Sequence, residues 1–138
     1  MIAYVDSPVV LRLILAEPGR LREWDSIEEA VTSELAQVEC LRTLDRLHAR
    51  AALTSEDLAT RRAAVFRLLE AIELVDVGKP VLARASEPFP TPLGTLDAIH
   101  LSTAILWKQW RSKEIVFATH DGRLGTAARA VGFEVVGT

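Results

Sequence analysis

The sequence predicts an α/β fold in which a mainly parallel sheet carries helices on both faces. Short apolar segments alternate with longer segments of helical periodicity along the 138 residues, which is the pattern of strands joined by helical crossovers. The composition, 49% hydrophobic and 25% charged, is ordinary for a soluble globular protein. Acidic residues, including Asp6 and Asp121, follow the expected strands. We therefore expect one domain that spans residues 1–138.

The first strand and helix are expected at the N-terminus. Residues 2–5 are short and apolar, as in a buried strand that ends at Asp6. Ser7 and Pro8 predict a helix start, with Ser7 as the cap and Pro8 at the first helical position. The helix ends before Pro18-Gly19, and two weaker elements come next: a short helix over 20–24 and a strand over 30–32.

Two long helices follow and predict an αα-hairpin. The first begins near Glu34 after a Thr32 or Ser33 cap, and its expected apolar face consists of Leu35, Val38, Leu41, Leu44 and Leu47. The second begins at Thr54, and Asp57 three residues later completes a capping-box pattern.

The remaining residues continue the alternation of strands and helices. Residues 72–77 read as a strand, and Thr95 is expected to cap a helix over 96–110 after a proline-rich loop. The other expected elements are a short helix over 81–85, strands over 115–119 and 133–136, and a helix over 121–131.

Four acidic residues are candidates for one site: Asp6, Glu39, Asp97 and Asp121. Asp6 ends the first strand, Asp121 follows the fourth, and Asp97 opens a helix after a loop that returns to the same edge. Functional groups of parallel sheets gather beyond the carboxyl ends of the strands. Connectivity therefore places three of the four at that edge, while Glu39 lies about a turn and a half into its helix.

A cluster of carboxylates requires a counter-charge. Two carboxylates about 4 Å apart repel by roughly 1 kcal/mol in water and about 4 kcal/mol at an effective dielectric constant of 20. Hard oxygen ligands favour Mg²⁺ or Mn²⁺ over zinc. An open site of this kind suggests phosphodiester chemistry.

Each candidate also has an ordinary structural explanation. Asp6 and Asp121 are placed to cap the following helices, Asp97 to favour a helix dipole, and Glu39 to face solvent. His100 lies three residues after Asp97 and on the same face of the expected helix. His100 is either a structural histidine or a residue that supports the site or contacts the substrate.

Several further residues flank the acids. Ser7 and Thr119 are small hydroxyl residues that are placed to orient ligands or water, and Arg123 is near enough to reach a phosphate. Thirteen of the sixteen basic residues are arginine, although the net charge is −3. Arginine binds phosphate better than lysine does, because its guanidinium group donates two parallel hydrogen bonds. Many lie on the two long helices, on a solvated face or as a basic rim around the acids: Arg42, Arg46, Arg50, Arg61, Arg62 and Arg67.

The rest of the sequence limits where the protein works. Trp107 and Trp110 are expected in core packing or at an oligomer interface, and the single cysteine, Cys40, excludes an intrachain disulfide. A reducing cytoplasm is the natural compartment. Asp6 and Arg12 interrupt the N-terminal apolar stretch, so neither a signal peptide nor a membrane span is expected.

Taken together, four blocks of sequence resemble the PIN-domain family, and within it the VapC-type toxins of bacterial toxin–antitoxin pairs. These blocks are Tyr4-Val5-Asp6-Ser7, Thr32-Ser33-Glu34-Leu35 with Val38-Glu39, Leu96-Asp97-Ala98-Ile99-His100-Leu101, and Ala118-Thr119-His120-Asp121 with Arg123-Leu124. The family's acidic quartet falls on Asp6, Glu39, Asp97 and Asp121, and its accessory hydroxyls on Ser7 and Thr119. Pro8 departs from the usual residues after the first acid.

The resemblance implies a PIN-like three-layer α/β/α sandwich with about five parallel strands. It also implies a Mg²⁺- or Mn²⁺-dependent endoribonuclease that cuts RNA, with tRNA or rRNA as the expected target. A homodimer and a small cognate antitoxin are the implied partners. There are two alternatives. One is a phospho-accepting receiver module, which requires a lysine after a late strand, and no lysine follows Thr119. The other is a PIN-like scaffold that binds RNA or protein without cutting.

Overall fold

The sheet contains five strands, all parallel, in a computed structural model that describes residues 1–138. The strands are β1 (Ile2–Val5), β2 (Glu29–Ser33), β3 (Glu73–Val75), β4 (Val116–Ala118) and β5 (Val135–Val136). Their order across the sheet is β3-β2-β1-β4-β5. The predicted sheet of about five parallel strands is confirmed.

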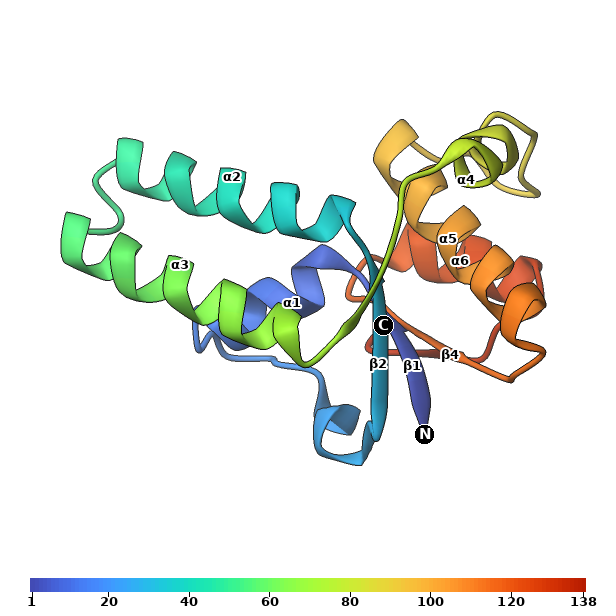
Figure 1. Cartoon of the computed structure of the whole chain (residues 1–138), viewed down its shortest axis with the longest axis horizontal. Helices are drawn as coiled ribbons and strands as arrows, with labels where there is room; N and C mark the ends of the chain where they lie inside the picture. The colour runs from blue at the N-terminus through green and yellow to red at the C-terminus, as the bar shows by residue number, and fades with distance from the viewer.

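Helices cover both faces of this sheet (Figure 1). One face carries α1 (Ser7–Ile14), α2 (Leu35–Ala49) and α3 (Ser55–Glu70), and the other carries α4 (Lys79–Ala85), α5 (Thr95–Arg111) and α6 (Gly122–Ala130). A 3₁₀ turn, η1 (Arg22–Ser26), precedes β2. The three-layer α/β/α architecture is therefore confirmed, and the α2–α3 hairpin extends beyond the sheet (Figure 1).

The alternation of side chains along β1 divides the core into two clusters. Ala3 and Val5 pack with α1, α2 and α3 residues, whereas Tyr4 packs with α5 and α6 residues on the opposite face. All three side chains are fully buried. Central parallel strands are buried on both faces, so every residue in them must be compatible with an apolar core.

The strand order reverses between β1 and β4. Strand β1 pairs with β2 on one side and with β4 on the other, and the β2 and β4 crossovers lie on opposite faces. Beyond the paired residues, the amide of Asp6 donates to the carbonyl of Ala118 at 3.2 Å. In open α/β sheets, ligands bind at such a reversal, outside the carboxyl ends of the strands. Asp6 and Thr119 are the residues that stand there.

Helix capping differs from the prediction at three of the helices. Helix α2 has Glu34 as its N-cap and no side-chain cap, although the amide of Leu35 donates to Ser33 Oγ at 3.1 Å. Asp6, not Ser7, caps α1, because its carboxylate accepts from the amide of Val9 at 3.1 Å. Helix α5 begins at Thr95 itself, after Gly94, with no side-chain cap. The expected capping box of Thr54 and Asp57 is confirmed at α3.

The buried stripe of α2 also differs from the predicted apolar face. Its buried residues are Ala36, Cys40 and Leu44, while Val38 is 56% exposed. The buried face therefore keeps Leu44 of the predicted set but continues through Cys40 and Ala36 at a spacing of four, which leaves Val38 facing solvent. Trp107 is a core residue and Trp110 is 56% exposed. No helix has the length and apolar character that crossing a bilayer would require.

Candidate active site

Asp6 is the most enclosed acid of the site. It directly follows β1, and its side chain is 1% exposed. The carboxylate accepts hydrogen bonds from the hydroxyl of Thr119 and from the amide of Val9. Burial raises the pKa of Asp6 above its ordinary value, and these two hydrogen bonds oppose that rise.

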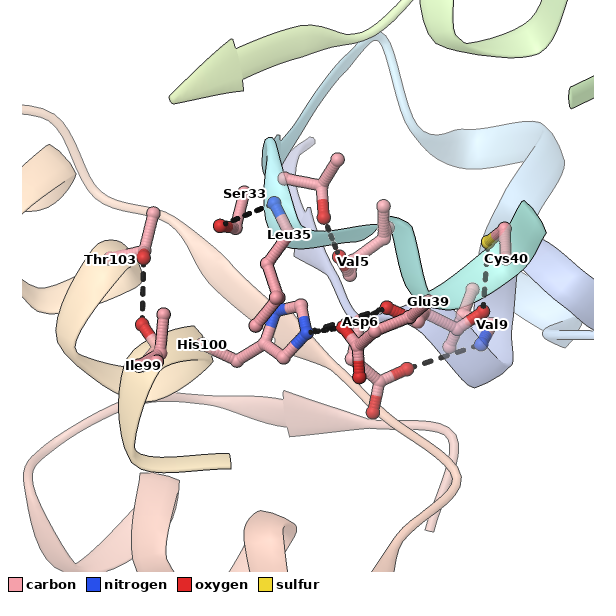
Figure 2. A network of polar contacts seen from close by, with 12 residues as sticks. Val5, Asp6, Val9, Ser33, Leu35, Glu39, Cys40, Ile99, His100 and Thr103 are labelled. Atoms are coloured by element: carbon pink, nitrogen blue, oxygen red, sulfur yellow. Dashed lines mark hydrogen bonds and ion pairs between the residues drawn. The ribbon is translucent and has the colours of Figure 1, made fainter. Parts of the chain in front are cut away.

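Glu39 is held by two polar side chains from other elements. Its Oε1 atom accepts from Ser7 Oγ at 2.6 Å and from His100 Nε2 at 2.5 Å. Figure 2 shows His100 reaching from α5 towards Glu39 on α2. Burial would raise the pKa of Glu39, but the hydrogen bond and charge of His100, together with Ser7, outweigh it and lower the pKa.

His100 is itself fixed from behind by Tyr4. The ring is 2% exposed, and its Nδ1 atom lies 2.6 Å from the hydroxyl oxygen of Tyr4. Burial raises the pKa of Tyr4, so the phenol stays protonated and forms a hydrogen bond with Nδ1. Because the carboxylate of Glu39 can only accept, the other ring nitrogen, Nε2, carries a proton. Both nitrogens of His100 contact protein atoms, and the ring thereby holds Glu39, while its predicted substrate contact stays a prediction.

Asp97 and Asp121 stand at the N-termini of α5 and α6. Asp121 caps α6, since its Oδ1 atom accepts from the amides of Arg123 at 2.8 Å and Leu124 at 3.1 Å. Asp97 has no such partner. Burial raises the pKa of Asp97, and the negative charges of Asp121 and Glu39 raise it further. Asp97 is thus the acid whose pKa is raised by repulsion from other acids of the cluster.

Thr119 connects two of the acids. Its hydroxyl donates to Asp6 and accepts from the amide of Asp121 at 3.0 Å, and the side chain is fully buried. The structure therefore brings Asp6, Thr119 and Asp121 into one hydrogen-bonded unit. Glu39, Ser7 and His100 form a second unit beside it.

The four acids gather at one edge, but their side chains are not arranged as metal ligands. No group of three or more His, Cys, Asp or Glu side chains has an arrangement that could hold a metal ion. Three of the four carboxylates face protein donors instead: hydroxyls, amides and the imidazole of His100. Their chemistry still fits Mg²⁺ or Mn²⁺, because all the donors are hard oxygens and a cation would relieve the repulsion at Asp97.

Arg123 lies in a hollow of about 1040 Å³ that opens beside Asp121. The lining consists of Thr91, Pro92, Asp121, Gly122, Arg123 and Thr126. Since none of these side chains is hydrophobic, the hollow suits a charged, hydrated ligand. Arg123 therefore lines the same hollow as Asp121, and its contact with a phosphate stays a prediction.

Tyr4 is the site residue that the sequence analysis misses. A fully buried tyrosine in a central strand needs a partner for its hydroxyl, and that requirement is the signal that points to it. The partner, His100, is 96 residues away in the chain, so only the fold identifies it.

Comparison with known proteins decides the family. The model of the PIN domain matches residues 3–130. The chain belongs to the PIN-domain family. Ribonuclease VapC47 of Mycobacterium tuberculosis (strain CDC 1551 / Oshkosh) is 32% identical over 94% of this chain and 92% of its own. Ribonuclease VapC46 of M. tuberculosis (strain ATCC 25618 / H37Rv) is 33% identical over 96% and 95%. Both relatives group the chain with the VapC-type PIN proteins.

A solved structure supports the PIN fold independently of sequence. A chain of a toxin–antitoxin complex from Klebsiella pneumoniae superposes with a TM-score of 0.68 at 14% identity. The match covers 97% of this PIN domain and 95% of that chain. At this identity the likeness concerns the fold, and it extends over essentially the whole domain.

Proposed function

We propose that this PIN-domain protein is a divalent-metal-dependent endoribonuclease, the toxin of a toxin–antitoxin pair. The observation that carries the proposal is the gathering of Asp6, Glu39, Asp97 and Asp121 where the strand order reverses. The relatives named as ribonucleases support the same activity. A reducing cytoplasm, with tRNA or rRNA as target, is the setting that we infer.

The four acids would hold Mg²⁺ or Mn²⁺, directly or through water. Such an ion lowers the pKa of a bound water and offsets charge on the scissile phosphate. Thr119 keeps Asp6 in place and Ser7 and His100 keep Glu39 in place, so both carboxylates are oriented before the substrate arrives. Arg123 would bind a phosphate oxygen of a single-stranded RNA segment beside Asp121.

A hollow of about 330 Å³ between α1 and α2 is the surface that we assign to the antitoxin. Its lining residues come from α1, α2 and the first turn of α5. Val38 and Leu96, which are 56% and 49% exposed, give it apolar contacts, and Glu39 lies on its wall. An apolar antitoxin segment that carries an arginine would reach the acids from here.

A homodimer is the second partner that we propose. Trp110 is exposed beside Arg111 in a hollow of about 410 Å³ at the β3 edge of the sheet. Exposed tryptophan and arginine are typical of protein interfaces. Trp110→Ala would then lower the mass measured by light scattering from that of a dimer to that of a monomer.

Cleavage of a mixed tRNA and rRNA pool tests the activity. The purified chain is incubated with Mg²⁺, with Mn²⁺ and with EDTA, beside Asp97→Asn as a control for contaminating nucleases. Site-limited products that need a metal and are absent with the variant would support the proposal. Products that persist with Asp97→Asn, or metal binding that is absent altogether, would favour the non-catalytic scaffold.

A further inference from the structure

A second basic hollow lies on the other side of the catalytic edge. It has a volume of about 380 Å³ and is bounded by the end of α1, the turn before β2 and the last residues of the chain. Three arginines supply its positive charge, Arg12, Arg20 and Arg22, and His120 also lines it. Leu21 is its only hydrophobic lining residue, and Glu23 is its only acid.

Most of this positive charge has no carboxylate partner. The guanidinium of Arg12 donates to the carbonyl of Gly19 at 3.0 Å, and Arg22 forms no ion pair. Only Arg20 has an acidic partner, Asp25 at 3.2 Å, in an exposed pair that is worth little. Arg12 and Arg22 thus bring two arginines without a carboxylate partner to one hollow, in a chain whose net charge is −3.

The turn between β4 and α6 contributes residues both to this hollow and to the edge that carries the acids. His120 lies between Thr119 and Asp121, and its Nδ1 atom lies 3.0 Å from the carbonyl of Gly137, which makes Nδ1 the donor. Its Nε2 atom has no hydrogen-bond partner. The next residue, Asp121, lines the hollow that contains Arg123. The neighbouring residues His120 and Asp121 therefore each line one of the two hollows.

We propose that this hollow, formed by Arg12, Arg20, Arg22 and His120, binds backbone phosphates of single-stranded RNA on one side of the cleaved bond. The strand would cross the β4–α6 turn and continue towards Arg123. The inference rests on the proposed ribonuclease function. Arginine forks suit phosphate oxygens, and phosphate contacts fix the position of a strand without reading its bases. The nearly complete lack of apolar lining argues against a pocket for a base or a small organic ligand.

The salt dependence of RNA binding tests this path. A short fluorescent single-stranded RNA is titrated with the chain over a series of NaCl concentrations, with EDTA present to prevent cleavage. The variants are Arg22→Ala and the triple change Arg12→Ala, Arg20→Ala, Arg22→Ala. Arg50→Ala, which removes the same charge at the far end of the α2–α3 hairpin, is the matched control (Figure 1).

Each phosphate contact that is lost should reduce the slope of log K against log salt by about 0.7. We expect that reduction for Arg22→Ala, about twice or more for the triple variant, and none for Arg50→Ala. The triple variant should also bind roughly tenfold more weakly at ~0.1 M salt. Because Arg12 holds the Gly19 turn, Arg22→Ala decides the result if the triple variant fails to fold.

Two results would overturn the inference. One is a slope that Arg22→Ala and a folded triple variant leave unchanged, and the other is an equal loss for Arg50→Ala, which would indicate diffuse attraction. The cleavage assay separates this inference from the proposed activity. RNA bound with the predicted slope but never cut would overturn the activity alone, while cutting with an unchanged slope would overturn the path alone.

Discussion

The Nε2 atom of His100 lies 2.5 Å from Oε1 of Glu39, and this contact joins α5 to α2 across the carboxyl edge of the sheet. Tyr4 supports the ring from within the core, at 2.6 Å from Nδ1. An acid near the middle of a helix would otherwise sample several rotamers. The buried imidazole gives the carboxylate of Glu39 one position and direction, which a preorganised site requires.

Replacing His100 should impair the site without removing any of its acids. We expect His100→Asn to lower cleavage by about 10–100-fold and to raise the Mn²⁺ concentration needed for half-maximal rate, since Glu39 loses its orienting donor. Tyr4→Phe, which removes only the hydroxyl behind the ring, should give a smaller effect in the same direction. Unchanged metal dependence in His100→Asn would show that Glu39 needs no such support.

The hydroxyl of Thr119 should matter more than its shape. Thr119→Val keeps the volume but leaves Asp6 and the amide of Asp121 each without one partner in a buried setting. The expected loss is about 1–3 kcal/mol in the free energy of unfolding, measured with urea. Thr119→Ser keeps the hydroxyl and should retain most of the stability and cleavage. A valine variant as stable as the serine variant would contradict this account.

The ionised carboxylate of Asp97 should lower the free energy of unfolding. Repulsion from Asp121 and Glu39 opposes its ionised form, so Asp97→Asn removes an unfavourable charge without changing the size of the side chain. After allowance for solvent screening, we expect a gain of about 0.5–1 kcal/mol, or roughly 2–4 °C in melting temperature, together with loss of cleavage. A variant that melts below the wild type would show that Asp97 is structurally required.

The fall in the free energy of unfolding at acidic pH should depend on Glu39. The pKa of Glu39 is lower in the folded than in the unfolded chain, so its contribution is present above the unfolded value of about 4.3 and is lost as pH falls through the folded value. Asp6 and Asp97, with raised pKa values, have the opposite sign and gain stability as they protonate.

Urea unfolding between pH 7 and pH 3 measures this dependence. The difference in unfolding free energy between the wild type and Glu39→Gln should be largest near pH 7 and shrink towards pH 3. Glu34→Gln, at an exposed position just before α2, serves as the matched control and should follow the wild type. A constant offset for Glu39→Gln across this range would exclude the proposed linkage.

The order of helices and strands is readable from the sequence because their periodicities are local. The first and last residues of the strands are harder to predict from the sequence. Residues 72–77, 115–119 and 133–136 give strands of two or three residues, because pairing ends where neighbouring strands end. The cap of α1 is another case: Asp6 and Ser7 are both good caps, and Ser7 is engaged instead by Glu39 from a distant helix.

The residues of the candidate site also differ in how well the sequence predicts their roles. Asp6 and Asp121 are predictable because they directly follow strands, and the reversal of strand order between β1 and β4 places them together. The role of His100 is not predictable from spacing, since its partners, Tyr4 and Glu39, are 96 and 61 residues away. Long-range hydrogen bonds of this kind leave no periodic signal in a sequence.

Calorimetric titration with Mn²⁺ tests the central claim, that the four acids act as one metal site. Wild type, Asp97→Asn, Glu39→Gln and the Glu34→Gln control are compared at pH 7 without RNA. We predict saturable binding for the wild type and Glu34→Gln, and affinity at least tenfold weaker for Asp97→Asn and Glu39→Gln. Equal Mn²⁺ affinity in all four proteins would contradict a metal site built from these carboxylates.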